Sequence, residues 1–219
     1  MVNSITELFE EQAKFLSLDS AESAKGQVQR KIIQSATKHF VQFGYRRASI
    51  ADIAQSVGIG KGTIYLHFKS KNEIFLCCQL VEEQQLLPKF ENIEKMHEKE
   101  RFSAFIEAYL NFVTSAPLTR ALLARPQDFA FLMDELEPNR TKYLRSKGEE
   151  YLAKTLINPI AQNVNPEEQI GIAKVVSMVI HAIGHLPDSM LEIFDIKAAD
   201  FIEILTKILE QGTKNTKSN

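Results

Sequence analysis

The chain has 219 residues, of which 44% are hydrophobic, and a formal net charge of −2 at pH 7. This length is enough to bury a sizeable core and permits one or two domains. No uncharged stretch reaches the length of a membrane span, and no basic segment followed by an apolar run opens the chain. We therefore expect a cytoplasmic protein.

Residues 1–24 form an acidic extension, with five Asp and Glu against one Lys. Its apolar residues follow a rough helical stripe: Ile5, Leu8, Phe9, Phe15 and Leu16. An acidic helix is unsuited to a nucleic-acid surface, so the pattern predicts an amphipathic helix docked on protein, either on its own body or on a second subunit. A frayed, solvated tail is the alternative.

A longer helix is predicted next. Ile33, Ala36, Phe40 and Phe43 recur at spacings of three, four and three, which places them on one helical face. Gly44 then supplies a stop.

Two short helices joined by a glycine turn follow. Ser49 can cap a helix whose apolar stripe is Ile50, Ile53, Ala54 and Val57. Gly58 can take the positive φ of a helix end, Ile59 is expected in the core, and Gly60 opens the second helix.

The second helix has two buried positions, Ile64 and Phe68, which are four residues apart and share a face. The remaining side chains are cationic, hydroxylated and aromatic, which suits DNA phosphates and base edges. Gly62 costs about 1 kcal/mol in a helix interior, so its presence indicates close approach of a partner. This pattern predicts a recognition helix, and an ordinary helical hairpin with a solvated face is the alternative. The predicted DNA-binding residues are Arg47, Ser49, Lys61, Gly62, Thr63, Tyr65, His67 and Lys69.

The charge distribution agrees with this prediction. Residues 25–71 carry nine Lys and Arg against one Asp, a balance of +8, whereas residues 1–24 carry −4 and residues 72–219 carry −6. A basic module on an acidic body is typical of a DNA-binding domain attached to a separate partner domain.

Residues 29–75, and above all the segment IADIAQSVGIGKGTIYLHFKSKNEIF, resemble the TetR family of bacterial transcriptional regulators. The resemblance implies that Lys61, Thr63, Tyr65 and His67 lie on the recognition helix. It also implies that Ser49 and Lys69 reach flanking phosphates. Gly60 departs from the Ser or Thr that many relatives carry before the Lys-Gly pair, which removes a side-chain cap at that point.

The rest of the chain is predicted to be helical, so the fold class is all-α. An S-x-x-E capping box at Ser70 opens a helix toward Pro88, and every proline lies at or after that residue. Cys77 and Cys78 are interpreted as buried packing residues. Further helices are expected at about 101–115, 118–124, 127–135, 139–162, 167–186 and 198–211.

The predicted organisation is an amphipathic extension (1–24), a three-helix DNA-binding domain with a helix-turn-helix (25–71), a helical effector-binding and dimerisation domain (72–211) and a disordered tail (212–219). Five of the fourteen phenylalanines fall between residues 102 and 131 and form either core or an apolar pocket. If they form a pocket, the effector is lipophilic. The predicted effector-binding residues are Phe102, Phe105, Tyr109, Phe112, Phe129, Met133, Tyr143, Met178 and His181.

No enzyme, metal site or cofactor is predicted. His181 and His185 have a metal-compatible spacing but lack a third ligand, and no nucleophile paired with a base stands out. Residues 167–186 and 198–211 are apolar enough to form a four-helix interface between two copies, with a buried monomer core as the alternative.

These features predict a homodimer on a palindromic DNA operator, released by a small lipophilic effector. Repression is the default sign, and activation stays open. The second hypothesis is a DNA-bound adaptor whose C-terminal domain docks a protein. An enclosed cavity at the aromatic cluster favours a sensor, and a filled core favours the adaptor.

Overall fold

The computed structural model describes residues 4–125, 127–128, 131–132, 138–161 and 164–184, together with residues 195, 200, 203–204, 207–208 and 211–212. The described residues form helices and turns without strands, which confirms the all-α prediction. The chain divides into two compact units. Unit 1 comprises Met1–Leu8, Leu86–Ser115 and Lys142–Asn219, and unit 2 comprises Phe9–Gln85 and Ala116–Thr141. This division reflects packing, and the functional domains predicted above stay a prediction.

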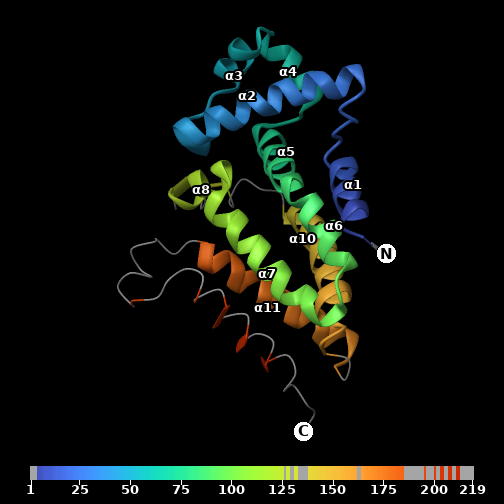
Figure 1. Cartoon of the computed structure of the whole chain (residues 1–219). Coiled ribbons are helices and arrows are strands. Elements are labelled where there is room, and N and C mark those ends of the chain that lie inside the picture. The colour runs from blue at the N-terminus through green and yellow to red at the C-terminus, as the bar shows by residue number, and fades with distance from the viewer. Residues whose placement is uncertain are drawn as a thin grey trace. The chain divides into compact units, whose positions relative to one another are not determined.

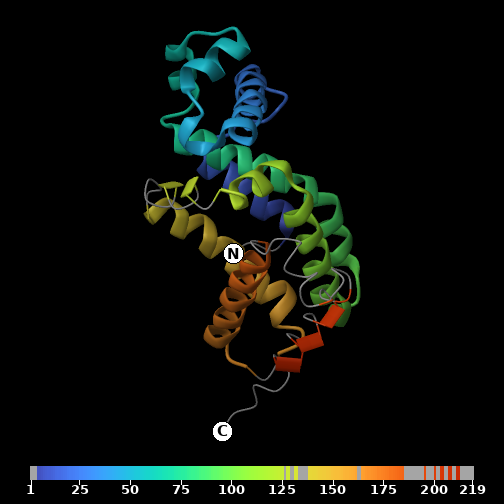
Figure 2. The same cartoon turned by 90° about the vertical axis from the view of Figure 1, so that its left-hand side faces the viewer.

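Unit 2 is built around a long helix. Its helices are α2 (Ala24–Arg47), α3 (Ile50–Val57), α4 (Lys61–His67), α5 (Lys71–Glu83) and α8 (Pro117–Leu123). Helix α2 packs against α3, α5 and α8 (Figure 1). Figure 2 shows α2, α3 and α4 gathered into one compact group.

Two glycines shape α2. The Ser23 hydroxyl caps the helix by accepting the Gly26 N–H at 2.9 Å, and a Cβ on Gly26 would lie 1.8 Å from the Ser20 carbonyl oxygen. Gly44 has a φ of 79° and interrupts the helix, as predicted. Phe43 is 43% exposed, so its predicted place in the buried stripe is wrong. The break at Gly44 ends that stripe at Phe40.

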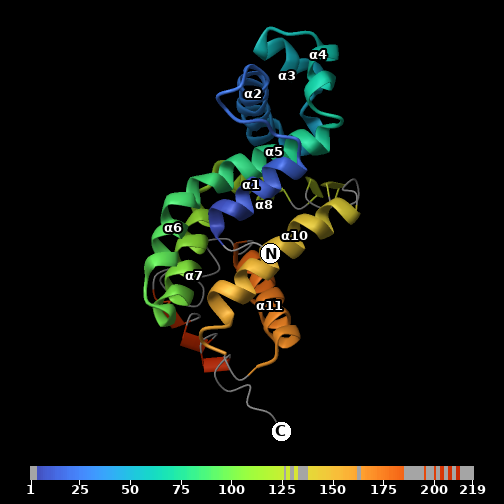
Figure 3. The same ribbon diagram turned by 90° about the vertical axis from the view of Figure 1, so that its right-hand side faces the viewer.

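Unit 1 contains α6 (Leu87–Lys95), α7 (Glu98–Ser115), most of α10 (Pro138–Leu152), a π-helical segment (Ala153–Ile157) and α11 (Pro166–Gly184). Helices α6 and α7 run side by side in Figures 1 and 3. The sequence pattern does not predict α6 as a separate helix, because Pro88 suggests a stop whereas it stands in the first turn of a new helix.

The acidic extension forms helix α1 (Ile5–Phe15), which confirms the prediction of an ordered amphipathic helix. Ile5, Leu8, Phe9 and Leu16 are all buried. In unit 1, the Ile5 N–H donates to Glu94 Oε1 at 2.7 Å and the Thr6 hydroxyl donates to Glu91 Oε1 at 2.9 Å. Both acceptors belong to α6, so the helix docks on its own chain.

Deleting residues 1–22 is expected to lower the melting temperature by at least about 5 °C, because burying each Leu or Phe contributes about 1.5–3 kcal/mol. The Ser23 cap of α2 remains, so the intrinsic DNA affinity of each dimer should be unchanged. Circular dichroism melts and gel shifts measure the two quantities. Glu10→Gln, at an exposed position of α1, is the control. Equal melting of the truncated and full chains would show that α1 contributes nothing.

Candidate nucleic-acid interface

Helix α3 packs against α4, the predicted recognition helix. The Ser49 hydroxyl accepts the Ala51 N–H at 3.1 Å, and Ile53 and Ala54 are buried. Gly58 has a φ of 77°, and its N–H closes the helix on the carbonyls of Ala54 and Gln55. This is the predicted left-handed stop, and it turns the chain directly into α4.

Helix α4 rests on the body of unit 2 through Ile64, which is fully buried, and through Phe68, directly after the helix, which is 1% exposed. Lys61, Gly62, Tyr65 and Leu66 are exposed, whereas Thr63 and His67 are half-buried. Gly60 caps the helix without a side-chain hydrogen bond, as the sequence implied. One short helix therefore presents a cation, a phenol and an apolar side chain to solvent.

Gly62 faces open space, since a Cβ built on it would have no neighbour within 4 Å. Nothing in the described structure requires glycine at this position, although glycine weakens a helix by about 1 kcal/mol. Close approach of a partner at Gly62 stays a prediction, and the open space there leaves room for it.

Cationic side chains flank α4. Arg47 and Lys69 are exposed. The predicted capping box at the start of α5 is formed at its Ser70 half, and the Glu73 carboxylate binds the backbone one residue before Ser70. The Glu73 N–H donates to the Ser70 hydroxyl at 3.2 Å, and the Glu73 carboxylate accepts the Lys69 N–H at 2.5 Å. The box fixes the backbone at Lys69 while its ammonium group stays in solvent.

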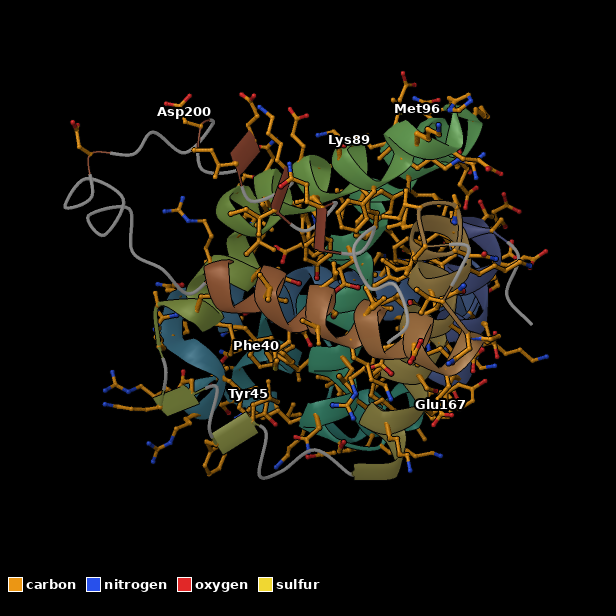
Figure 4. All side chains as sticks on the ribbon, turned by 90° about the horizontal axis from the view of Figure 1, so that it is seen from below. Phe40, Tyr45, Lys89, Met96, Glu167 and Asp200 are labelled. Carbon is orange, nitrogen blue, oxygen red and sulfur yellow. The ribbon has the colours of Figure 1, made fainter. Side chains whose placement is uncertain are left out.

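Tyr45 anchors the segment that leads into α3. Its ring is 2% exposed and lies 5.7 Å from the Phe40 ring and 5.2 Å from the Phe75 ring (Figure 4 labels Phe40 and Tyr45). Its hydroxyl donates to the Asn72 side chain, and the Lys71 ammonium lies 4.5 Å from the ring centroid. These contacts hold the chain between α2 and α3 against α5.

Two charged side chains hold helix α8 against this DNA-binding module. The sequence did not predict either contact. The buried Glu82 carboxylate accepts the N–H groups of Leu118 and Thr119 at 2.6 and 2.9 Å, which caps α8. The Arg125 guanidinium donates to the carbonyls of Val41 and Gln42 at 3.1 and 3.3 Å. Neither contact has a local sequence pattern.

A cavity of about 730 Å³ lies in unit 2 beside the contact between Arg125 and α2. Its lining includes Arg46, Arg47, Phe43, Phe131 and Asp128. The Arg46 guanidinium lies 5.2 Å from the Phe131 ring, and that ring lies 6.2 Å from the Tyr45 ring. Phe131 thus packs with the DNA-binding module within unit 2.

Several predicted effector residues form an aromatic stack in unit 1. Phe102 is fully buried, and the Phe105 ring lies 4.8 Å from Phe90 and 5.9 Å from Tyr109, which in turn lies 6.0 Å from Phe112.

The structure describes two of the other predicted effector residues. Tyr143 is half-buried beside Lys147, and Met178 is 65% exposed on α11. Phe129, Met133 and the side chain of His181 lie outside the described residues.

Cys77 and Cys78 are buried, as predicted. The Cys78 thiol lies 3.6 Å from the Ile33 carbonyl oxygen, and burial raises its pKa to about 12. It therefore stays a protonated packing residue. Among the described residues, no group of His, Cys, Asp and Glu is arranged to hold a metal, and no helix is both long and apolar enough to cross a bilayer.

Comparison with known proteins agrees with this geometry. Residues 32–78 match the model of the bacterial regulatory proteins of the tetR family. The uncharacterized HTH-type transcriptional regulator YhgD of Bacillus subtilis is 29% identical over 137 residues, covering 58% of this chain and 71% of that protein. The fatty acid metabolism regulator protein of the same organism is 28% identical over 85 residues, covering 38% and 44%.

The solved structure of the fatty acid degradation regulator FadR from Bacillus halodurans has a TM-score of 0.57 at 14% identity, covering 90% of this chain and 100% of that one. At this identity the likeness concerns the fold alone. The fold and the exposed face of α4 define a helix-turn-helix DNA-binding protein. At residues 32–78 the chain carries the DNA-binding domain of the TetR family of bacterial transcriptional regulators.

Proposed function

We propose that the protein is a homodimeric repressor that binds a palindromic operator and is released by a small lipophilic effector. It acts in the bacterial cytoplasm, where such an operator lies. The observation that carries the proposal is the exposed face of α4. Tyr65 and Leu66 are 48% and 80% exposed, while Ile64 behind them is fully buried.

Each predicted DNA-contacting residue has a role in this proposal. Arg47, Lys61 and Lys69 neutralise phosphates, and the Ser49 hydroxyl can donate to a phosphate while it accepts the Ala51 N–H. Thr63, Tyr65 and His67 extend from α4 to base edges or the backbone, and Gly62 admits close approach.

Release requires a ligand that prefers a conformation in which the two recognition helices no longer match the operator. In a two-fold dimer those helices lie about 34–36 Å apart, and the ligand shifts the population by its differential affinity for the two conformations. The Glu82 and Arg125 contacts supply a physical coupling, because a displacement of α8 acts directly on α5 and on the end of α2.

Two properties of the chain support a lipophilic effector. The predicted effector domain carries the aromatic stack of Phe90, Phe105, Tyr109 and Phe112. The sequence is also similar to a regulator of fatty acid metabolism, which makes fatty acids the first compounds to test.

At least one compound in a panel of fatty acids, acyl thioesters and neutral aromatic lipophiles is expected to raise the melting temperature and weaken operator binding. A ligand at about 100 times its Kd stabilises the native state by about 2.7 kcal/mol. Thermal-shift assays followed by operator titrations measure both effects. A panel without any binder, or a binder that leaves operator affinity unchanged, would contradict effector release.

The Tyr109→Trp variant distinguishes a pocket residue from a core residue. If Tyr109 lines a pocket, the variant should lose its response to the effector and retain its DNA affinity and melting temperature. If Tyr109 is a core residue, the variant should lose effector response and DNA affinity together, with a lower melting temperature. The complete burial of Phe102 is the observation that favours the second candidate, a DNA-bound adaptor that docks a protein.

A further inference from the structure

Leu66 has the largest exposed fraction among the large apolar side chains of the described residues, at 80%. It lies on α4, a helix of seven residues whose remaining exposed positions are polar, aromatic or glycine. An isolated exposed leucine on a surface helix needs no explanation, but one at the centre of a recognition face has a consequence for base readout.

The position of Leu66 on the helix follows from its distance to the buried side. Successive residues of an α-helix are rotated by about 100°, so Leu66 lies about 200° from the fully buried Ile64. It therefore points directly away from the body of unit 2. Tyr65 and His67 lie to either side of it, and both are less exposed than Leu66.

Gly62 lies four residues before Leu66, on the same side of α4. Because a Cβ on Gly62 would meet nothing within 4 Å, the surface next to Leu66 is lowered rather than filled. The wall of the DNA major groove can approach α4 at Gly62, which brings Leu66 against the base edges.

The major groove offers hydrogen-bonding groups on every base pair and one prominent apolar group, the C5-methyl of thymine. A leucine side chain has no hydrogen-bonding group to offer the polar edges. The flanking cations Lys61 and Lys69 are both exposed and favour a polyanion over an apolar protein surface as the occupant.

We propose that Leu66 reads the methyl group of one thymine in each operator half-site and thereby sets the base preference at that position. This inference rests on the proposed function, since it requires α4 to enter the major groove. It assigns apolar readout to a residue outside the DNA-binding set predicted from the sequence.

The test begins with duplexes that the full-length protein selects from a random pool. Each thymine of the selected site is then replaced by deoxyuridine in both half-sites at once, which removes the methyl group and leaves the hydrogen-bonding edge intact. Affinities are measured by fluorescence anisotropy at fixed salt. We expect one symmetric pair of thymines whose replacement weakens wild-type binding about tenfold.

Leu66→Ala should bind more weakly and lose its response to deoxyuridine at that pair, while Leu66→Met should retain it. Lys61→Gln is the matched control. It should weaken binding at every sequence and reduce the salt dependence, yet keep the methyl response. Unchanged circular dichroism of the variants verifies their folding, which Leu66 supports little at 80% exposure.

Failure of the proposed function can be distinguished from failure of the inference about Leu66. If the wild-type protein selects no sequence, the proposed function fails and the inference fails with it. If it selects a site but no thymine pair loses its methyl response in Leu66→Ala, the readout by Leu66 is overturned while the regulator assignment stands.

Discussion

Replacing Tyr65 by alanine is expected to lower operator affinity at least about thirtyfold. The ring is 48% exposed on α4, so its removal leaves the fold intact and deletes one contact in each half-site. A specific contact contributes about 1–3 kcal/mol, and the dimer loses it twice. Gel-shift titration with the selected operator measures the loss.

The control for this prediction is Tyr143→Ala, which removes a half-buried tyrosine of unit 1. It should leave operator affinity unchanged without an effector. Wild-type binding should also weaken steeply with salt, because Lys and Arg contacts release counterions from the phosphates. Wild-type affinity in Tyr65→Ala would remove α4 as the recognition helix.

Replacing Met178 by glutamate is expected to convert the protein to monomers at micromolar concentration and to abolish cooperative operator binding. Val175 and Met178 are 51% and 65% exposed on α11, and Ile204 and Ile208 are 52% and 59% exposed in the second predicted interface segment. A carboxylate buried at an apolar interface without a partner costs several kcal/mol in each subunit. Analytical ultracentrifugation measures the change.

Lys89→Glu is the matched control, because it introduces the same acidic group at an exposed position of α6 (labelled in Figure 4). It should leave the dimer intact. A Met178→Glu protein that sediments as a dimer would place the interface elsewhere.

The helix-turn-helix could be predicted from the sequence because its determinants are local. Ser49, Gly58 and Gly60 punctuate two short helices, and the spacing of Ile53, Ala54 and Ile64 fixes their buried faces. Caps, glycine stops and helical periodicity each act within a few residues, so one sequence contains the whole signal.

The features that were predicted wrongly from the sequence differ for physical reasons. Phe43 fits the helical period, yet Gly44 breaks α2 directly after it, and its ring lies beside His39 rather than in the core. Pro88 opens α6 instead of ending a helix. The predicted helix at 139–162 gives way to a π-helical segment at residues 153–157, because a single π turn does not alter the helical period enough to be seen in the sequence.

The long-range contacts could not be predicted at all. Glu82 reaches the start of α8, 36 residues away, and Arg125 reaches the end of α2 across 84 residues. The helical period leaves Leu66 available to a partner, but an apolar residue carries no charge or hydrogen bond that marks it as a DNA contact, so the predicted site does not include it. The proposal for Leu66 rests on its 80% exposure on α4.

The most direct test of the regulator assignment is selection of binding sites from a random duplex pool by the full-length protein, followed by sequencing and footprinting. Two inverted half-sites, centred about 34–36 Å apart on one face of the duplex, are the expected result. Such a site would match one α4 to each half. Recovery of no enriched sequence, or of a single half-site without two-fold symmetry, would contradict the account.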